Sequence, residues 1–217
     1  MKKHIYLIPG TAASSNIFDR IKFPKDEFEI HFIDWLIPVS LNESIEAYSM
    51  RLSKQIYHQN PIIIGVSFGG IIAQEISKIL PSKEIVIISS IKNKYELSKI
   101  LYFVKISRLY LLVTPKLINL TEKILSFTFG NRTKKQIEVY RNYLPYRNSI
   151  YLRWAVKQAL FWKQKISIPG IIHLHGTNDF VFPIRNIKAC LKIENGSHAM
   201  ILTKGKKISS ILLNKFK

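Results

Sequence analysis

Six short runs of apolar residues, separated by helix-length stretches, most constrain the fold of this 217-residue chain. Several runs, such as PIIIGV and EIVIISS, are apolar at consecutive positions and do not alternate. Strands of this kind are buried on both faces, as in a parallel sheet covered by helices. The runs cover residues 4–9, 29–34, 61–66, 84–90, 170–175 and 190–194. They predict an α/β protein with a doubly wound, mostly parallel sheet of about six strands.

Helical patterns lie between the strand-like runs. Residues 42–58 carry apolar side chains three and four positions apart, with Asn42 as the expected N-cap. Residues 70–80 predict a second helix, which ends before Pro81. Four more helices are expected between the fourth and fifth strands, at Glu96–Val113, Pro115–Thr128, Thr133–Leu144 and Asn148–Lys165. We therefore predict one sheet domain, residues 1–91 and 169–217, with a helical cap inserted at 92–168.

Charge is concentrated on the predicted cap. The chain has 33 Lys and Arg against 14 Asp and Glu, a net charge of +19. Residues 92–168 contain 16 of the basic and 3 of the acidic residues, a net charge of +13. Two interpretations stay open, a solvated basic surface and a surface that attracts an anionic partner. Nucleic acid is not expected, because no nucleic-acid-binding motif accompanies the charge.

Several classes of protein are disfavoured by simple observations. A single Cys excludes a disulfide framework, and no apolar run reaches the roughly 18–20 residues of a transmembrane helix. The apolar part of the N-terminus is broken by Pro9-Gly10, so it predicts a strand better than a secretory signal, and we expect the cytoplasm. Neither a phosphate-binding glycine loop nor a metal-ligand motif is present, so no cofactor and no metal are expected.

The pentapeptide Gly65-Val66-Ser67-Phe68-Gly69 matches G-x-S-x-G and lies between a predicted strand and a predicted helix. A serine at such a sharp turn needs small residues two positions before and after it, so that the chain can fold back. The turn exposes the hydroxyl at the N-terminus of the following helix. Ser67 is therefore the candidate nucleophile.

A nucleophilic serine needs a base, and the base needs an orienting acid. His198 is the candidate base because it follows the last strand in the small-residue turn Asn195-Gly196-Ser197. Asp179 is the candidate acid, in the loop after the preceding strand, and Asp34 is its main competitor. The order Ser67, Asp179, His198 is the one expected of such a triad. The other histidines are interpreted as structural: His4, His31 and His173 within strands, His58 at a helix end, and His175 at the close of a strand.

The oxyanion of an acyl-transfer intermediate needs backbone N–H donors. The first expected donor is Phe68, directly after the nucleophile. The second is Thr11, in the loop PGTAASS after the first strand, where small residues let the backbone approach a ligand.

These segments together resemble the α/β-hydrolase superfamily over nearly the whole chain: LIPGTAASSNIF (7–18), IIIGVSFGG (62–70), LHGTNDFVFP (174–183) and IENGSHAM (193–200). Two departures are Pro9, where the family usually has His before Gly, and Ser197, where it usually has Gly before the catalytic His. The resemblance implies a Ser-His-Asp acyl hydrolase, commonly a carboxylesterase or thioesterase, with a helical cap at 92–168.

The predicted function is hydrolysis of an ester or thioester with an apolar acyl group through an acyl-enzyme on Ser67. Residues 100–113 are apolar with Lys105 and Arg108 interposed, which suits a cap helix beside an acyl site. Two acidic partners are candidates for the basic cap, an acyl carrier protein and anionic lipid at a membrane surface. The alternatives are a non-catalytic binding protein for an anionic partner and an acyltransferase on the same scaffold.

Overall fold

A computed structural model describes residues 2–112 and 142–216. Its six strands form one sheet in the order β2-β1-β3-β4-β5-β6, and every neighbouring pair is parallel. The strands are β1 (Lys3–Ile8), β2 (Phe28–Phe32), β3 (Ile62–Val66), β4 (Glu84–Ile88), β5 (Ile172–Gly176) and β6 (Leu191–Ile193). The predicted six-stranded parallel sheet is therefore confirmed, with strand ends that differ from the expected ones by at most two residues.

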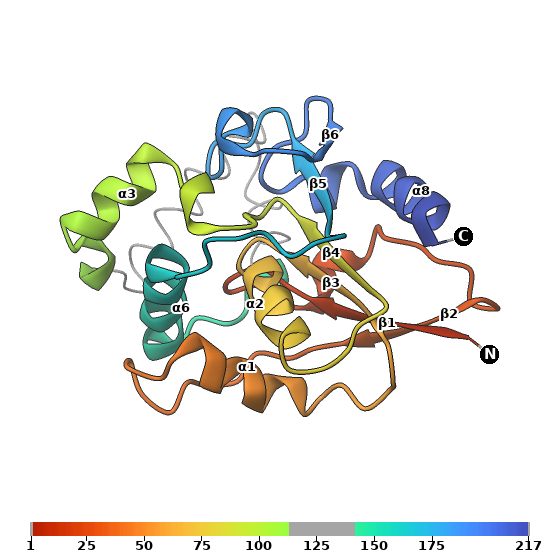
Figure 1. The fold of residues 1–217 in the computed structure, drawn as a ribbon, viewed down its shortest axis with the longest axis horizontal. Coiled ribbons are helices and arrows are strands. Elements are labelled where there is room, and N and C mark those ends of the chain that lie inside the picture. Colours follow the sequence, from red (N-terminus) through yellow and green to blue (C-terminus); the bar gives the residue numbers. More distant parts are fainter. Residues whose placement is uncertain (1, 113–141, 217) are drawn as a thin grey trace.

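Helices cover both faces of the sheet (Figure 1). One face packs against α1 (Ile45–Ser53), α2 (Phe68–Ser77) and α6 (Ser149–Phe161). The other face packs against the short α7 (Met200–Thr203) and the C-terminal α8 (Gly205–Phe216). The central β3 is buried along its whole length, because both of its faces carry apolar side chains, as its consecutive isoleucines predict.

Both ends of α1 differ from the expected helix at 42–58. The N-cap of α1 is Ser44, whose Oγ accepts a hydrogen bond from the N–H of Ala47 at 3.1 Å, and not Asn42. Both residue types are good caps, so sequence alone did not separate them. The helix ends at Ser53, five residues before His58, so the expectation that His58 ends a helix is wrong.

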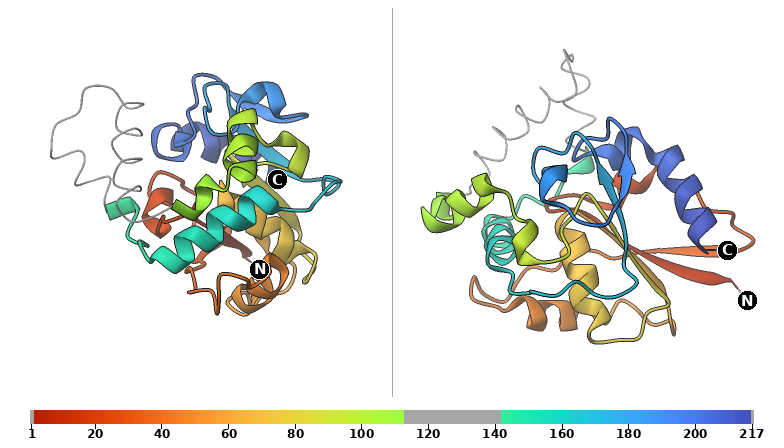
Figure 2. Two further views of the ribbon diagram at one scale, coloured as in Figure 1. Left: turned by 90° about the vertical axis from the view of Figure 1, so that its left-hand side faces the viewer. Right: turned by 45° about the horizontal axis from the view of Figure 1, so that its top comes forward.

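The described parts of the predicted cap behave in two different ways. Trp154 of α6 is fully buried, lies with its ring centroid 4.1 Å from that of Tyr48 at an interplanar angle of 36°, and donates from Nε1 to the carbonyl of Glu43 at 2.8 Å. The helix α3 (Lys99–Ile106) lies beside α6, away from the sheet, and has no buried residue (Figure 2). The predicted helices Pro115–Thr128 and Thr133–Leu144 lie wholly or mostly in 113–141, outside the described residues.

In residues 2–112 and 142–216, no helix is both long enough and apolar enough to cross a membrane.

Candidate active site

Ser67 occupies the sharp turn between β3 and α2. Its backbone has φ 53° and ψ −120°, a conformation that costs a non-glycine residue free energy. Three hydrogen bonds hold it: the N–H of Ser67 donates to the carbonyl of Ile88 at 2.9 Å, and the carbonyl of Ser67 accepts from Ser90 Oγ at 2.7 Å and from the N–H of Gly70 at 2.9 Å. Ile88 at the end of the neighbouring strand β4, and Ser90 just after it, therefore hold the strained turn in place.

The flanking glycines are required by close backbone approach. A Cβ on Gly65 would lie 2.1 Å from the carbonyl oxygen of Gly69, and a Cβ on Gly69 would lie 2.2 Å from that of Pro9. Neither distance is tolerable and both neighbours are main chain, so no side-chain rearrangement could relieve the overlap. The requirement for small residues on both sides of the serine is thereby confirmed.

Asp179, His198 and Ser67 form one hydrogen-bonded chain. His198 Nδ1 lies 2.9 Å from Asp179 Oδ2, and His198 Nε2 lies 3.0 Å from Ser67 Oγ. These three side chains come from three loops at the carboxyl ends of β5, β6 and β3, which meet at one edge of a parallel sheet. The structure thus brings together all three residues that the sequence singled out.

The carboxylate of Asp179 is held in place on its far side. The residue is 3% exposed, and its Oδ1 accepts hydrogen bonds from the N–H groups of Val181 and Phe182, both at 2.9 Å. Burial opposes the charged form, but the contact with His198 and the N–H of Phe182 outweigh it and lower the pKa of Asp179. Oδ2 is left facing His198.

The fixed carboxylate determines the tautomer of His198. An ionised carboxylate only accepts hydrogen bonds, so Nδ1 carries the proton and Nε2 is free to accept the hydroxyl proton of Ser67. The ring edge is also covered by Phe182, at 5.5 Å between centroids. The arrangement can therefore remove a proton from Ser67 when the serine attacks a carbonyl carbon.

Comparison with known proteins gives similarity at the level of structure. No protein-family model matches the chain, and no curated protein matches it in sequence. A thermophilic esterase from Thermogutta terrifontis superposes with a TM-score of 0.74 at 14% identity, covering 100% of this chain and 90% of the other. A bromoperoxidase from Bacillus anthracis gives a TM-score of 0.69 at 16% identity, covering 98% and 91%. An alpha/beta hydrolase fold protein from Burkholderia ambifaria gives 0.71 at 12%, covering 99% and 91%.

The chain has the α/β-hydrolase fold. The turn after β3 and the loop after β1 meet where Gly10 lies directly against Ser67. A Cβ on Gly10 would be 3.5 Å from Ser67 Cβ. Trp35 Nε1 donates to the carbonyl of Gly10 at 3.1 Å, and the N–H of Ala13 donates to the same carbonyl at 3.0 Å. The loop is thereby pinned beside the serine.

The two expected oxyanion donors lie on either side of this contact. Phe68 is the first residue of α2, so its N–H has no acceptor within the helix. Thr11 directly follows Gly10, and the next residue, Ala12, has φ 65°. A positive φ at this point turns the loop sharply. The assignment of these two N–H groups to an oxyanion remains a prediction.

Two further histidines of the α/β-hydrolase core lie behind Asp179, where the sequence indicated only a structural role. His175 Nε2 lies 2.7 Å from the carbonyl of Phe182 and 3.5 Å from Asp179 Oδ2, and its Nδ1 lies 3.0 Å from His173 Nε2. Burial lowers the pKa of both His173 and His175. The neutral His175 packs against the Asp179 carboxylate without competing for its charge.

Asp34, the competing candidate acid, lies elsewhere. Its carboxylate accepts a hydrogen bond from the Tyr146 hydroxyl at 3.2 Å, and its N–H donates to Gln55 Oε1 at 2.9 Å.

The contact between His175 and Asp179 was missed because a four-residue spacing across a turn, HGTND, is not a recognisable motif. Ser90 was missed for a similar reason: its partner, the carbonyl of Ser67, is in another strand–loop unit.

Proposed function

We propose that this protein is a serine hydrolase that cleaves a carboxylic ester or thioester with an apolar acyl group. The observation that carries the proposal is the hydrogen-bonded chain from Asp179 through His198 to Ser67, at 2.9 and 3.0 Å. A nucleophile, a base and an orienting acid in contact, beside a strained turn, are the parts that acyl transfer requires. Solved structures of the same fold include esterases.

In the proposed reaction, Ser67 Oγ attacks the acyl carbon while its proton passes to His198 Nε2. Asp179 stays ionised and stabilises the imidazolium. The N–H groups of Phe68 and Thr11 bind the oxyanion of the tetrahedral intermediate. His198 then gives the proton to the departing alcohol or thiol, which leaves an acyl ester on Ser67. Water, deprotonated by His198, attacks this ester and releases the carboxylic acid and the free serine.

An apolar acyl group is supported by the aromatic residues near the nucleophile. The ring of Phe68, next to Ser67, lies 5.7 Å from that of Trp35, which in turn lies 5.5 Å from Tyr151. Phe182 adds an aromatic edge beside His198. An acidic acyl carrier protein is the proposed partner, supported by the net charge of +13 over residues 92–168.

Labelling with a fluorophosphonate probe, followed by assays with p-nitrophenyl esters of increasing chain length, tests the proposal. We expect wild type to be labelled and Ser67→Ala not to be, because only an activated serine reacts with the probe. The ester series would then size the acyl site. Absence of labelling in well-folded wild type would contradict the proposal and favour the non-catalytic binding protein.

An acyltransferase would give the same labelling, because both reactions share the acyl-enzyme. The two are separated by adding alcohol or thiol acceptors to the ester assay. Hydrolysis predicts release of the free acid at a rate independent of the acceptor. Turnover that needs the acceptor and transfers the acyl group to it would replace hydrolysis with acyl transfer.

A further inference from the structure

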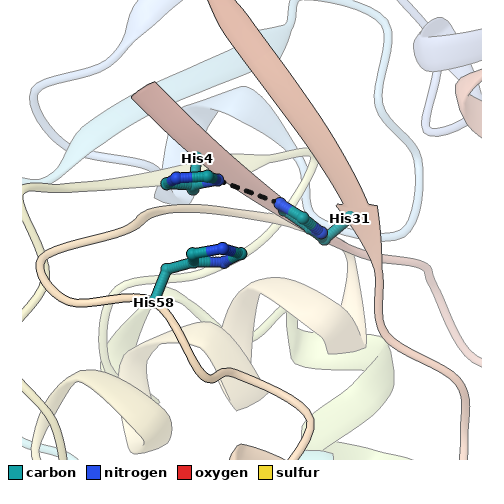
Figure 3. A group of neighbouring side chains, drawn as sticks. All are labelled: His4, His31 and His58. Atoms are coloured by element: carbon teal, nitrogen blue, oxygen red, sulfur yellow. Dashed lines mark hydrogen bonds between the residues drawn. The ribbon is translucent and has the colours of Figure 1, made fainter. Parts of the chain in front are cut away.

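Three histidines gather at the end of the sheet opposite to Ser67 (Figure 3). His4 is the second residue of β1, His31 lies near the end of β2, and His58 lies in the loop before β3. One ring nitrogen from each lies within 4.8 Å of the other two. From His4 to Ile8 the strand alone spans about 13 Å at about 3.3 Å per residue, and Gly10, which lies against Ser67, is two residues further on, so the cluster is remote from the proposed chemistry.

Strand pairing builds the cluster. In the parallel register of β1 and β2, His4 pairs with Glu29 and Tyr6 pairs with His31. Side chains two residues apart on a strand share a face, so these four groups project from the same side of the sheet. His4 Nδ1 lies 3.2 Å from His31 Nε2, and carboxylate oxygens of Glu29 lie 3.7 and 3.8 Å from the same two nitrogens.

The hydroxyl groups of two tyrosines contact two of the imidazole rings and orient them. The Tyr6 hydroxyl lies 2.8 Å from His58 Nδ1, and the Tyr57 hydroxyl lies 3.4 Å from His31 Nδ1. Both contacts engage Nδ1, so the ligand atoms would be Nε2 of His58 and Nε2 of His31, which now faces His4 Nδ1. Histidines that bind metal commonly have their second nitrogen engaged in this way.

The charge around the cluster limits which ions could bind. Lys2, Lys3 and Lys83 line a hollow together with His4, Glu29 and His58. Positive charge disfavours Ca²⁺ and Mg²⁺, which depend on several oxygen ligands and on electrostatic attraction. Ions such as Zn²⁺, Ni²⁺ and Cu²⁺ form strong bonds to imidazole nitrogen and depend less on net charge.

We propose that His4, His31 and His58, with Glu29 as the fourth ligand, form a binding site for one imidazole-preferring divalent transition metal. Nothing in the sequence predicted this site, because its ligands are far apart along the chain. The ion ties β1, β2 and the loop before β3 together. Its role is to stabilise this end of the sheet, independently of Ser67.

Binding needs a small local movement. Tetrahedral Zn²⁺ with bonds of about 2.0–2.1 Å places its nitrogen ligands roughly 3.4 Å apart. The ligand nitrogens of His4 and His31 already lie 3.2 Å apart, so the movement falls on His58, whose ligand nitrogen lies within 4.8 Å of theirs. The rings of His4 and His58 now stack at 3.5 Å between centroids, 6° from parallel, and His58 can turn because it lies in a loop. The proton shared by His4 and His31 moves to the other nitrogen of the ring that holds it.

Zinc titration of EDTA-treated protein without a polyhistidine tag tests the proposal. Calorimetry should give one Zn²⁺ per chain, and Co²⁺ should give the intense visible absorption of a four-coordinate ion. Zn²⁺ should also raise the Tm. His4→Asn, His31→Asn and His58→Asn should each weaken zinc binding by at least about tenfold. Their Tm in EDTA should stay near that of wild type, which separates loss of metal from loss of fold.

Two further variants keep the test decisive. Glu29→Gln retains size at a half-exposed position, so it should fold, weaken Zn²⁺ and change the Co²⁺ spectrum. His198→Asn removes an imidazole outside the cluster and should leave zinc affinity unchanged. Absence of stoichiometric binding, binding that survives all three histidine variants, or binding that depends on His198 would each overturn the proposal.

Discussion

Histidines occur at both ends of the same sheet, and the two groups differ in what fixes each imidazole. At the carboxyl end, His198 contacts Asp179, whose carboxylate is buried and held by two backbone N–H groups. At the amino end, His4 and His31 contact each other, and the nearby Glu29 side chain is 52% exposed and lies beyond hydrogen-bonding distance. The same side chain therefore has a fixed acid at one end and none at the other.

This difference underlies the two proposed roles, a base at the carboxyl end and metal ligands at the amino end. A buried carboxylate assigns one tautomer to its imidazole and directs the other nitrogen at a single acceptor or donor. Imidazoles that share a proton keep both tautomers accessible and can converge on an ion. Residue type alone therefore does not assign the proposed roles. The side chain that contacts each imidazole ring distinguishes the two groups of histidines.

The largest expected effect is on catalysis at the carboxyl end. Ser67→Ala and His198→Asn should each lower kcat for a p-nitrophenyl ester by about 10⁴–10⁶-fold, since the triad acts as a unit. Circular dichroism should show an unchanged fold. If His198→Asn kept most of the activity, the distinction between the two groups of histidines would fail.

Asp179→Asn should have the next largest effect, a fall in kcat of about 10³–10⁴-fold. In the variant, the amide oxygen would accept the hydrogen bonds of the Val181 and Phe182 N–H groups, so the amide nitrogen would face His198. An amide N–H group cannot accept a proton from Nδ1, so His198 would lose its present tautomer. The measurement is steady-state ester hydrolysis at pH 8, together with urea unfolding to check the fold.

Asp34→Asn is the matched control, because Asp34 also follows a strand and was the competing candidate acid. Its carboxylate contacts the Tyr146 hydroxyl, not a histidine. The change should alter kcat by no more than about threefold, as is usual for a residue outside the reacting groups. A large loss in Asp34→Asn with a small one in Asp179→Asn would reverse the assignment of the acid.

The carboxyl end was accessible from sequence because its determinants are local. Gly65 and Gly69 flank Ser67 at fixed spacing, and Asp179 and His198 each lie in the loop that follows a strand. In a parallel sheet all such loops meet at one edge, so the pattern of strands was enough to bring them together.

The amino end was not accessible because it depends on register. That His4 pairs with Glu29 and Tyr6 with His31 follows from how β2 aligns with β1, and a strand pattern does not specify that alignment. His58 reaches the cluster only because α1 ends at Ser53 and leaves a loop, whereas the periodicity predicted a helix through His58. Tertiary packing also gave α6 its buried Trp154, which a description as part of a cap did not anticipate.

Buried neutral histidines behind Asp179 predict a pH dependence of stability. Burial lowers the pKa of His173 and His175 in the folded chain. Below the ordinary value of about 6.5 the unfolded chain therefore binds protons that the folded chain does not, and stability falls as pH falls. Each histidine contributes up to about 1.4 kcal/mol per pH unit until its folded pKa is reached.

Urea unfolding in EDTA at pH 7.5, 6.5 and 5.5 measures this dependence. His173→Gln removes one of the two groups, so its free energy of unfolding should fall less steeply between pH 6.5 and 5.5 than that of wild type. An equal slope in the two proteins would show that His173 is not held neutral by the fold.

The smallest expected effect concerns the tyrosines that orient the amino-end histidines, where no carboxylate performs that task. Tyr6→Phe removes the hydroxyl 2.8 Å from His58 Nδ1 and should weaken zinc binding by about tenfold, as loss of an orienting group outside the ligands does. Tyr57→Phe is the matched control, because its hydroxyl lies 3.4 Å from His31 Nδ1 and on an exposed side chain, so its loss should change affinity less. Competition with a chromophoric chelator measures both. If Tyr57→Phe weakened zinc more than Tyr6→Phe, the orienting contact would belong to His31, and His58 would bind without a fixed ring.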